Sequence, residues 1–423
     1  MNRLLAALAV TAGFCSAASV PTFSKDVYPI IRNKCQGCHQ QGEIAPMAFT
    51  NFGDTRPWAK AIGEAVNRGA MPPWHADGRA SARFENDRSL TPAERQAIAA
   101  WVASGAKEGK SIEYPAPVKP DNGWKLGKPD MVLRLPGYKV QAKGDVPYTF
   151  VVFPTNLKQD TWVYAAEWRI DKRSVVHHMN AFVRPPGSSY VAGYQPLEFF
   201  VPTIQQRRVA RQGEGAYERR ELLIGFEPGY APIPWGPRQG KLIKAGSDIV
   251  FECHFNPNGT ETVDSSELGL YFAKEPPAER VVSLSVQNMN FLIPPGDANY
   301  QSDASVTFAA PVKVVSVQPH MHLRGKAMRI EAVLPGSAAK PVIDVPRYDF
   351  HWQTTYFLRE PMALPEGSKL NCTAWFDNSP NNRYNPDATR AVPWGDQSWD
   401  EMHIGFVEVS FDARTNADKL MKP

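Results

Sequence analysis

Short runs of β-branched and aromatic residues recur along the chain from Met131 onward, and turn signals such as Pro-Gly and Asn-Gly separate them. The 423 residues include 38 prolines and 30 glycines. Regularly spaced short strands with such turn signals are typical of β-sandwiches and β-barrels. This part of about 280 residues has room for two sandwiches. We expect them at 131–285 and 286–415, with the break near the turn signal at 294–296.

The segment before Met131 has a helical pattern instead. An amphipathic stretch covers residues 59–68, and a second one begins at Thr91, where Thr91 and Glu94 fit a capping box. We expect a small all-α domain at 20–108, joined to the β-rich part by a proline-rich linker at 109–130.

Within the helical segment, Cys35-Gln36-Gly37-Cys38-His39 has the spacing C-x-x-C-H, which is the attachment site of a c-type haem. Each cysteine sulfur bonds to a haem vinyl group, and the histidine becomes an axial ligand of the iron. The sequence therefore predicts one covalent haem c at Cys35, Cys38 and His39, and 20–108 is interpreted as a c-type cytochrome domain.

The haem iron needs a second axial ligand. Met71 lies in Ala70-Met71-Pro72-Pro73-Trp74, which resembles the methionine loop of small c-type cytochromes, and a methionine ligand raises the reduction potential. Met71 is the predicted ligand, with Met47 and His75 as the alternatives.

Residues 1–18 have the pattern of a secretory signal peptide: Arg3, an apolar stretch that ends at Phe14, and small residues at 16–18. The apolar stretch is too short to span a membrane, and no later one is long enough. Export to the periplasm or the medium agrees with the haem motif, because covalent haem attachment takes place outside the bacterial cytoplasm. Cys15 leaves lipidation open, although the bulky Phe14 disfavours it.

The net charge of +4 is small for a chain of this length, and no run of lysine or arginine stands out. Nucleic-acid-binding proteins carry a basic patch or stripe, so we expect no nucleic-acid partner. Once the haem cysteines are set aside, Cys253 and Cys372 remain in the exported chain. They form either one disulfide or two buried thiols.

Among nine histidines, four form two close pairs, His177-His178 and His320-Met321-His322, and His254 follows a strand-like run. Residues two apart in a strand point to the same face, so His320 and His322 would form a two-imidazole clamp. His177 and His178 would converge only at a strand end or a bulge. A lone histidine is most often a hydrogen-bonded core or surface residue. Two pairs among strands favour a metal instead, and imidazole suits Cu, Zn, Fe or Ni.

Four motifs follow one another along the chain: Val176-His177-His178-Met179, Glu252-Cys253-His254-Phe255, Pro319-His320-Met321-His322 and Asp400-Glu401-Met402. As an ordered set they resemble the copper sites of the ascorbate-dependent type II copper monooxygenases. That family includes peptidylglycine α-hydroxylating monooxygenase and dopamine β-monooxygenase. The resemblance covers about residues 130–415, which is two domains' worth of chain, and implies two jelly-roll-like sandwiches.

The resemblance also implies two copper ions. His177, His178 and His254 would bind an electron-transfer copper on the first sandwich. The oxygen-activating copper on the second sandwich would be bound by His320, His322 and Met402. Two imidazoles and a thioether favour Cu(I), which can bind O2. The alternative for Met402 is a core methionine at a strand end.

Three positions depart from the family's pattern. Gln318 stands where the peptide enzyme has an arginine that holds the substrate carboxylate, and Phe406 stands where it has a tyrosine that helps to bind the peptide. A glycine-extended peptide is therefore not the expected substrate. His403 stands where the family often has a cysteine bonded to one in the strand of Cys372. We interpret His403 as a strand residue rather than a support for the copper ligands.

The predicted fold class is a multidomain chain, with a small all-α cytochrome c domain followed by two all-β jelly-roll-like sandwich domains. The predicted activity is that of an exported copper-dependent monooxygenase that uses O2 to hydroxylate a C–H bond of a small organic substrate. Electrons from a periplasmic donor would pass from the haem to the three-histidine copper and then to the second copper. The tethered haem would replace ascorbate, because a covalent link gives a high effective concentration.

Two other functions stay open. A cytochrome-fused copper reductase would need a blue-copper site with one cysteine, two histidines and a methionine, and the chain has no matching Cys-x-His-x-Met arrangement. A non-catalytic periplasmic electron-transfer or copper-binding protein would keep the metals without a substrate pocket. Gln318 and Phe406 are compatible with that alternative.

Overall fold

The computed structural model describes residues 20–41, 43, 45–77, 83–115, 123–203, 205–206, 215–227, 232–395 and 397–422. The signal peptide expected at 1–18, including Cys15, lies outside these residues, as does part of the linker expected at 109–130.

Helices make up 13% of the structure and lie mainly in its N-terminal part. Their bounds are η1 (Phe23–Val27), α1 (Tyr28–Lys34), α2 (Phe52–Thr55), η2 (Arg56–Trp58), α3 (Ala59–Asn67), α4 (Pro92–Ala103), α6 (Ala216–Arg219) and η4 (Ala417–Lys419). The capping box predicted at Thr91 is confirmed, since its side chain accepts from Glu94 N and the Glu94 carboxylate accepts from Thr91 N.

The strands fall into two groups along the chain. The first group is β1 (Met131–Arg134), β2 (Tyr138–Val140), β3 (Thr149–Pro154), β4 (Thr161–Arg169), β5 (Val176–Arg184), β6 (Phe199–Phe200), β7 (Glu221–Phe226), β8 (Gln239–Ile243), β9 (Asp248–Phe255), β10 (Thr262–Asp264) and β11 (Glu267–Phe272). The second group is β12 (Glu279–Asn288), β13 (Leu292–Ile293), β14 (Tyr300–Thr307), β15 (Val312–His320), β16 (Gly325–Val333), β17 (Lys340–Val345), β18 (Tyr356–Leu364), β19 (Lys369–Phe376), β20 (Val392–Pro393) and β21 (His403–Asp412).

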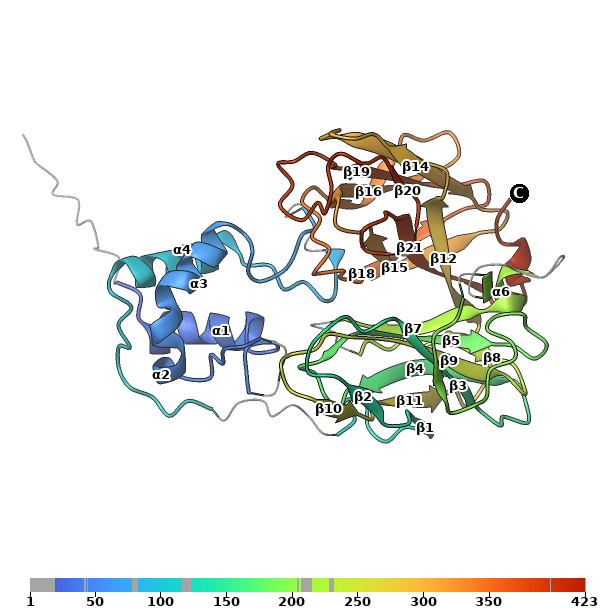
Figure 1. The fold of residues 1–423 in the computed structure, drawn as a ribbon, viewed down its shortest axis with the longest axis horizontal. Helices are drawn as coiled ribbons and strands as arrows, with labels where there is room; N and C mark the ends of the chain where they lie inside the picture. Colours follow the sequence, from blue (N-terminus) through green and yellow to red (C-terminus); the bar gives the residue numbers. More distant parts are fainter. Residues whose placement is uncertain are drawn as a thin grey trace, which may run out of the picture.

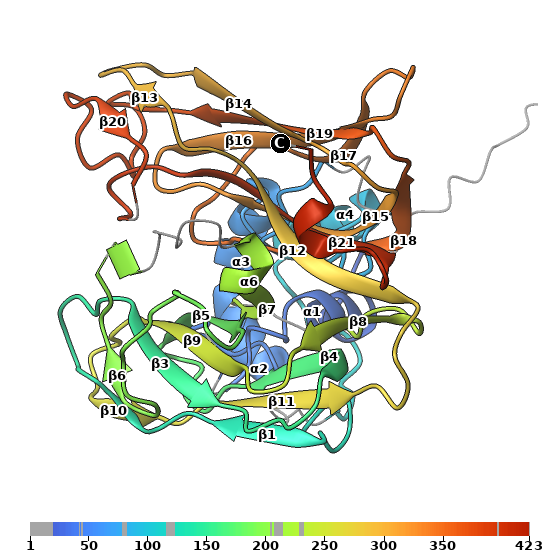
Figure 2. The same cartoon turned by 90° about the vertical axis from the view of Figure 1, so that its right-hand side faces the viewer.

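These strands form two sandwich-like units, which are stacked in both views (Figures 1 and 2). In the first, the five-stranded sheet β6-β3-β9-β5-β7 covers β1, β11, β4 and β8, and side chains such as Val163 and Phe251 fill the space between them. In the second, the sheet β14-β19-β16-β17 covers β12, β21, β15 and β18 around residues such as Val409 and Ile330. The predicted β-rich part is consistent with these sheets.

One sheet runs through both units. Its eight strands have the order β1-β11-β4-β8-β12-β21-β15-β18, and the two halves meet where β12 pairs in parallel with β8 through Glu279 and Arg280. Along the rest of its length β12 pairs with β21 in antiparallel fashion. The two sandwiches are thus joined by backbone hydrogen bonds as well as by the chain between them.

The expected fold class is wrong in its N-terminal part, because the described residues contain no small all-α cytochrome domain and the protein is mostly β-sheet. The N-terminal helices are short, and the described residues between them at 35–41, 45–51, 68–77 and 83–91 form neither a long helix nor a long strand. Trp74 and Phe84, between two of the predicted helices, are buried in the core of the second sandwich. Helices are present at 59–67 and 92–103, but Trp74 and Phe84 between them pack against the second sandwich.

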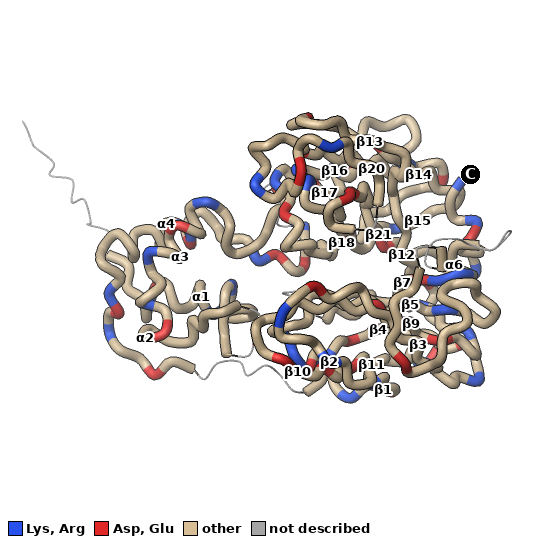
Figure 3. The backbone as a smooth tube through the Cα atoms, in the orientation of Figure 1, with Lys and Arg blue, Asp and Glu red and all other residues tan. Residues whose placement is uncertain are grey.

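Charged residues of both signs are interspersed along the described chain (Figure 3), in keeping with the small net charge. None of the described helices has the length and hydropathy that a membrane span requires.

Candidate metal centres

The first candidate centre lies on two neighbouring strands of the first sandwich. β5 and β9 are antiparallel, and His178 pairs with His254 in their register. The register shifts between Val176 and His178, and this irregularity lets the adjacent His177 and His178 turn toward one side. One ring nitrogen from each of the three histidines lies within 4.8 Å of the others. The structure therefore brings His177, His178 and His254 together.

The nitrogens of this cluster face one another. His177 Nδ1 lies 3.1 Å from His178 Nδ1, and the buried His254 Nδ1 has no hydrogen-bond partner among the described residues. Tyr148 stacks on the His254 ring with a centroid distance of 4.4 Å and an angle of 13°. Burial lowers the pKa of all three imidazoles, that of His254 to about 4. A neutral imidazole can offer a ring nitrogen to a metal, and the buried Nδ1 of His254 is available for one. The cluster therefore fits a copper ion.

The second candidate centre lies on the second sandwich, where β15 ends at His320. The rings of His320 and His322 have centroids 5.3 Å apart. His320 Nδ1 lies 2.5 Å from Gln353 Oε1, and His322 Nδ1 lies 3.2 Å from the carbonyl oxygen of Asp400. Partners on Nδ1 leave the Nε2 atoms as the ligand atoms. Burial lowers the pKa of His320 to about 4 and that of His322 to about 3.

A buried carboxylate holds the backbone at this second pair. Glu401 accepts hydrogen bonds from His322 N at 2.8 Å and from Arg324 N at 2.5 Å. Burial raises the pKa of Glu401 to about 8, and the backbone N–H groups act against that rise. Met402 follows directly and is half-buried, one residue before β21 begins. The structure thus connects the segment of Met402 to that of His322, and the ligand role of Met402 stays a prediction.

His403 lies in the core rather than at the metal pair. Its Nδ1 lies 2.9 Å from Ser302 Oγ, and its Nε2 lies 3.4 Å from Cys372 Sγ. Cys372 and Cys253 are both buried free thiols, and they belong to the cores of different sandwiches. Of the two alternatives for these cysteines, the structure has two buried thiols. Since Cys253 is packed in the core, it does not offer the cysteine ligand that a blue-copper site needs.

The haem motif follows α1 directly. His39 Nδ1 lies 3.2 Å from the carbonyl oxygen of Met47, and Phe49 stacks on the His39 ring with a centroid distance of 4.3 Å. A hydrogen bond at Nδ1 leaves Nε2 for an axial ligand, so His39 and the two cysteines fit a covalent haem. Met71 is half-buried in the stretch after α3. Its role as distal ligand stays a prediction.

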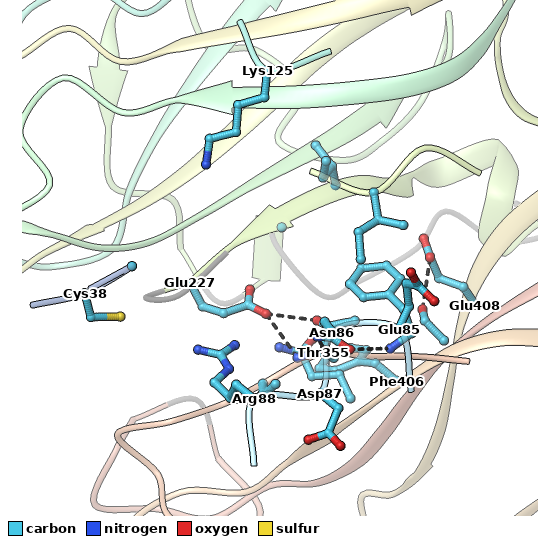
Figure 4. A pocket seen from close by; sticks show the side chains of 18 of the residues that line it. Cys38, Glu85, Asn86, Asp87, Arg88, Lys125, Glu227, Thr355, Phe406 and Glu408 are labelled. Atoms are coloured by element: carbon cyan, nitrogen blue, oxygen red, sulfur yellow. Dashed lines mark hydrogen bonds between the residues drawn. The ribbon is translucent and has the colours of Figure 1, made fainter. Parts of the chain in front are cut away.

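A cavity of about 540 Å³ lies between the N-terminal segment and the two sandwiches (Figure 4). Cys38 of the haem motif lines one part of it. Gln318 and Phe406, which pair in the register of β15 and β21, line another part. Asn180, two residues after His178 on β5, also lines it. The cavity is therefore lined by a member of the haem motif and, for each of the two histidine groups, by a residue two positions away in sequence.

Several residues around the sites could not have been found by sequence reasoning. Gln353 is 33 positions from His320, and Glu227 and Asn86 reach the cavity from other parts of the chain. None of them belongs to a recognisable motif. Arg324 did have a signal: it lies two residues after His322, and a buried arginine in a β-rich core needs partners. The structure gives it Asn378 Oδ1 at 2.8 Å and the Trp399 carbonyl at 2.9 Å.

Comparisons with known proteins cover the second sandwich, which carries the second candidate centre. Residues 281–408 match the family model "Copper type II ascorbate-dependent monooxygenase, C-terminal domain". A curated relative, MOXD1 homolog 1 of Drosophila melanogaster, is 29% identical over 154 residues. That match covers 33% of this chain and about a fifth (21%) of the relative's own length.

Solved structures add nothing to this. A structure of infectious bursal disease virus, Gx strain, has a TM-score of 0.20 and 8% identity over 70% of this chain and 75% of that one. The Macrobrachium rosenbergii nodavirus structure has a TM-score of 0.17 and 11% identity over 72% and 96%. These TM-scores are too low to support an argument. The second sandwich of this chain is similar to the C-terminal domain of the copper type II ascorbate-dependent monooxygenases, and this family-level similarity supports copper as the metal.

Proposed function

We propose that the protein is an exported copper-dependent monooxygenase with a built-in haem. The observation that carries the proposal is the shared cavity, which is lined by Cys38, by Asn180 beside the three-histidine cluster, and by Gln318 and Phe406 beside His320. A substrate in this cavity would lie between the two sandwiches, and the haem motif would lie at its edge. The family match over 281–408 supports the reaction class.

The proposed ligand sets combine the sequence motifs with the clustering of the histidines. His177, His178 and His254 would hold one copper, and His320, His322 and Met402 would hold the other. Cys35, Cys38 and His39 would hold the haem, with Met71 as its distal ligand. When bound, these groups supply one-electron chemistry: a C–H substrate, O2, two electrons and two protons give a hydroxylated product and water. Electrons from a periplasmic donor would enter at the haem motif and reach the second centre by way of the first.

The protein's own residues prepare this reaction. Gln353 and the Asp400 carbonyl hold the two imidazoles of the second centre by their Nδ1 atoms, and ligand orientation of this kind tunes metal affinity. Gln318 Nε2 donates a hydrogen bond to the backbone carbonyl oxygen of Gln353 at 2.8 Å. It is therefore already engaged and offers no charge to an anionic substrate. Phe406 adds apolar surface beside His320, which favours a small substrate that is not a peptide acid.

The proposal is tested on full-length protein exported to the periplasm of a host that attaches c-type haem. One haem and two copper ions per chain are expected, together with O2 consumption that depends on a substrate from a panel of hydrophobic small molecules. One atom of isotopically labelled O2 should enter the product. His320→Ala should keep the haem and the first copper but lose hydroxylation.

Two results would contradict the proposal. A chain that binds fewer than two copper ions lacks one of the centres. A chain that binds both and never transfers an oxygen atom is the non-catalytic electron-transfer or copper-binding alternative.

The distal ligand has its own spectroscopic test. Methionine ligation of ferric haem gives a weak thioether-to-iron band in the far red. Met71→Ala should abolish that band while the haem stays attached through Cys35 and Cys38. If the band survives, Met47→Ala and His75→Ala distinguish the two alternatives, and Met71 is not the ligand.

A further inference from the structure

The N-terminal segment reaches the second centre through a short stretch that docks on β18, the last strand of the eight-stranded sheet. Phe84 forms an antiparallel bridge with Leu358, and Glu85 N donates to the Phe357 carbonyl at 2.8 Å. Phe84 itself is fully buried in the core of the second sandwich. This stretch therefore extends the sheet at its edge, and it is held there by backbone and side chain alike.

Asn86 makes the next two contacts with its side chain. Its Nδ2 donates to the Thr355 carbonyl at 2.7 Å, and its Oδ1 accepts from Phe357 N at 3.2 Å. The Asn86 amide thus bonds to one backbone carbonyl and to one backbone N–H at the start of β18. Figure 4 shows Asn86 next to Thr355 at the cavity, with Phe406 and Glu408 on the same side.

The first sandwich contacts the same point. Glu227, just after β7, accepts with Oε1 from Thr355 N at 3.2 Å and from Thr355 Oγ1 at 3.0 Å. Thr355 is therefore bound from two directions, by Asn86 through its carbonyl and by Glu227 through its N–H and hydroxyl. Three parts of the chain that are far apart in sequence meet at this one residue.

Gln353, which contacts the second centre, lies two residues before Thr355 in the chain. Gln353 holds His320 Nδ1 through its side chain, and its backbone carbonyl accepts from Gln318 Nε2. Its Nε2 donates to the Phe350 carbonyl at 3.2 Å, and the Phe350 ring lies 5.9 Å from the His322 ring. Only Thr354 lies between Thr355 and Gln353, and the side chain and backbone carbonyl of Gln353 are both held by hydrogen bonds to the segment of His320.

We propose that Asn86 is a positioning residue for the second metal centre: by fixing the backbone at Thr355 and Phe357, it sets the place of Gln353 and hence the orientation of the His320 imidazole. The docking of the haem-bearing segment then determines the geometry of the centre at which O2 reacts. This inference rests on the proposed function, because it takes His320 to be a copper ligand. It adds a role for a residue that lies outside the four motifs and outside the family match.

The test compares two alanine variants of the same docking stretch in the full-length protein. Asn86→Ala removes the contacts that lead to Gln353. Arg83→Ala is the matched control, since the Arg83 guanidinium donates to the Pro341 carbonyl at 3.0 and 3.1 Å, near β17 and away from Gln353. Each protein is loaded with copper, and the electron paramagnetic resonance spectrum of Cu(II) is recorded in a His254→Ala background, which isolates the second centre.

Asn86→Ala is expected to change the Cu(II) spectrum of the second centre and to weaken its copper affinity about 10-fold or more, the usual range for residues that support a ligand. Arg83→Ala should leave both as in the parent. Asn86→Gln keeps both a donor and an acceptor on a side chain one methylene longer, so it should give a smaller change. This milder variant keeps the test valid where the alanine variant folds poorly.

A second measurement needs no metal. In copper-free protein, Asn86→Ala should increase the hydrogen exchange rate of the Thr355 and Phe357 amides, and Arg83→Ala should not. The proposal is overturned by a parent-like copper spectrum in both Asn86 variants, or by the same change in Arg83→Ala. Absence of copper from the parent protein would instead refute the proposed function, so the two failures are distinguishable.

Discussion

A histidine can bind a metal through either ring nitrogen, and the hydrogen bond on the other nitrogen decides which one is available. In the second pair, Gln353 and the Asp400 carbonyl occupy both Nδ1 atoms, so Nε2 faces the metal site. In the three-histidine cluster the Nδ1 atoms of His177 and His178 face each other, and that of His254 is unpartnered. We infer metal binding through Nδ1 at the first centre and through Nε2 at the second.

Loss of the Gln353 side chain should therefore affect one centre only. We expect Gln353→Ala to weaken copper binding at His320 and His322 by about 10- to 100-fold, the usual effect of removing a group that orients a ligand. Competition with a copper chelator measures this. Gln301→Ala serves as the control, because the Gln301 amide donates to the exposed Asp303 and not to a histidine of either centre. Equal copper affinity in Gln353→Ala and Gln301→Ala would show that Gln353 does not orient the His320 ring.

The buried imidazoles should also make the stability of copper-free protein depend on pH. Burial lowers the pKa of His254 and His320 to about 4 and that of His322 to about 3, whereas histidine in an unfolded chain titrates near 6.5. Between those values the unfolded state binds more protons, so stability is complete above about pH 6.5 and falls as the pH falls toward 4. Each histidine contributes about 1 kcal/mol per pH unit in that range.

Urea denaturation of copper-free protein at several pH values from 7 to 5 measures this slope. His254→Gln should remove one titrating group and make the decline less steep. An unfolding free energy that stays constant down to pH 5 would show that these imidazoles are not buried in the neutral form.

At the scale of elements, the strand pattern predicted the β-rich part of the chain. It did not predict how the strands position the histidines of the candidate metal centres. The strand-like run before His254 lies within β9. The convergence of His177 and His178 depends on the irregular register between β5 and β9. Such a shift comes from pairing between strands some 70 residues apart, so residue spacing along one strand allowed it but did not require it.

Phe84 gives an element-scale prediction. It is fully buried in the core of the second sandwich although it precedes that sandwich by about 200 residues. We expect Phe84→Ala to lower the free energy of unfolding by about 3–5 kcal/mol, the range for a buried phenylalanine. Phe199→Ala, at a half-buried position on the short β6, should cost clearly less. Similar losses in thermal or urea unfolding would mean that the stretch at 83–88 is not part of this core.

At the scale of the whole molecule, the two sandwiches are joined by a buried charge pair as well as by the shared sheet. Lys241 on β8 is fully buried, lies 2.6 Å from Glu408 on β21, and donates to Ser283 Oγ and to the Leu222 carbonyl. Leu222, Ser283 and Glu408 also line the cavity. The pair therefore fixes the two halves relative to each other at the wall of the proposed substrate site.

Removal of one partner should be costly. Lys241→Met leaves the Glu408 carboxylate without its cation and should destabilise the protein by about 3–5 kcal/mol, whereas a double variant with Glu408→Gln should recover much of the loss. Lys313→Met, which breaks the exposed pair with Glu279, should cost about 1 kcal/mol or less. If Lys241→Met and Lys313→Met lower the free energy of unfolding by the same amount, the Lys241–Glu408 pair does not hold the two sandwiches together.

The sequence by itself determined what is local: the C-x-x-C-H spacing, the two histidine pairs, the capped helix at Thr91 and the alternation of short strands with turns. Each of these is written in neighbouring residues, because backbone geometry places residues a few positions apart in fixed relation. The tertiary structure alone brought Gln353 to His320, and Asn86 and Glu227 to Thr355, since contacts between distant segments depend on how whole surfaces pack.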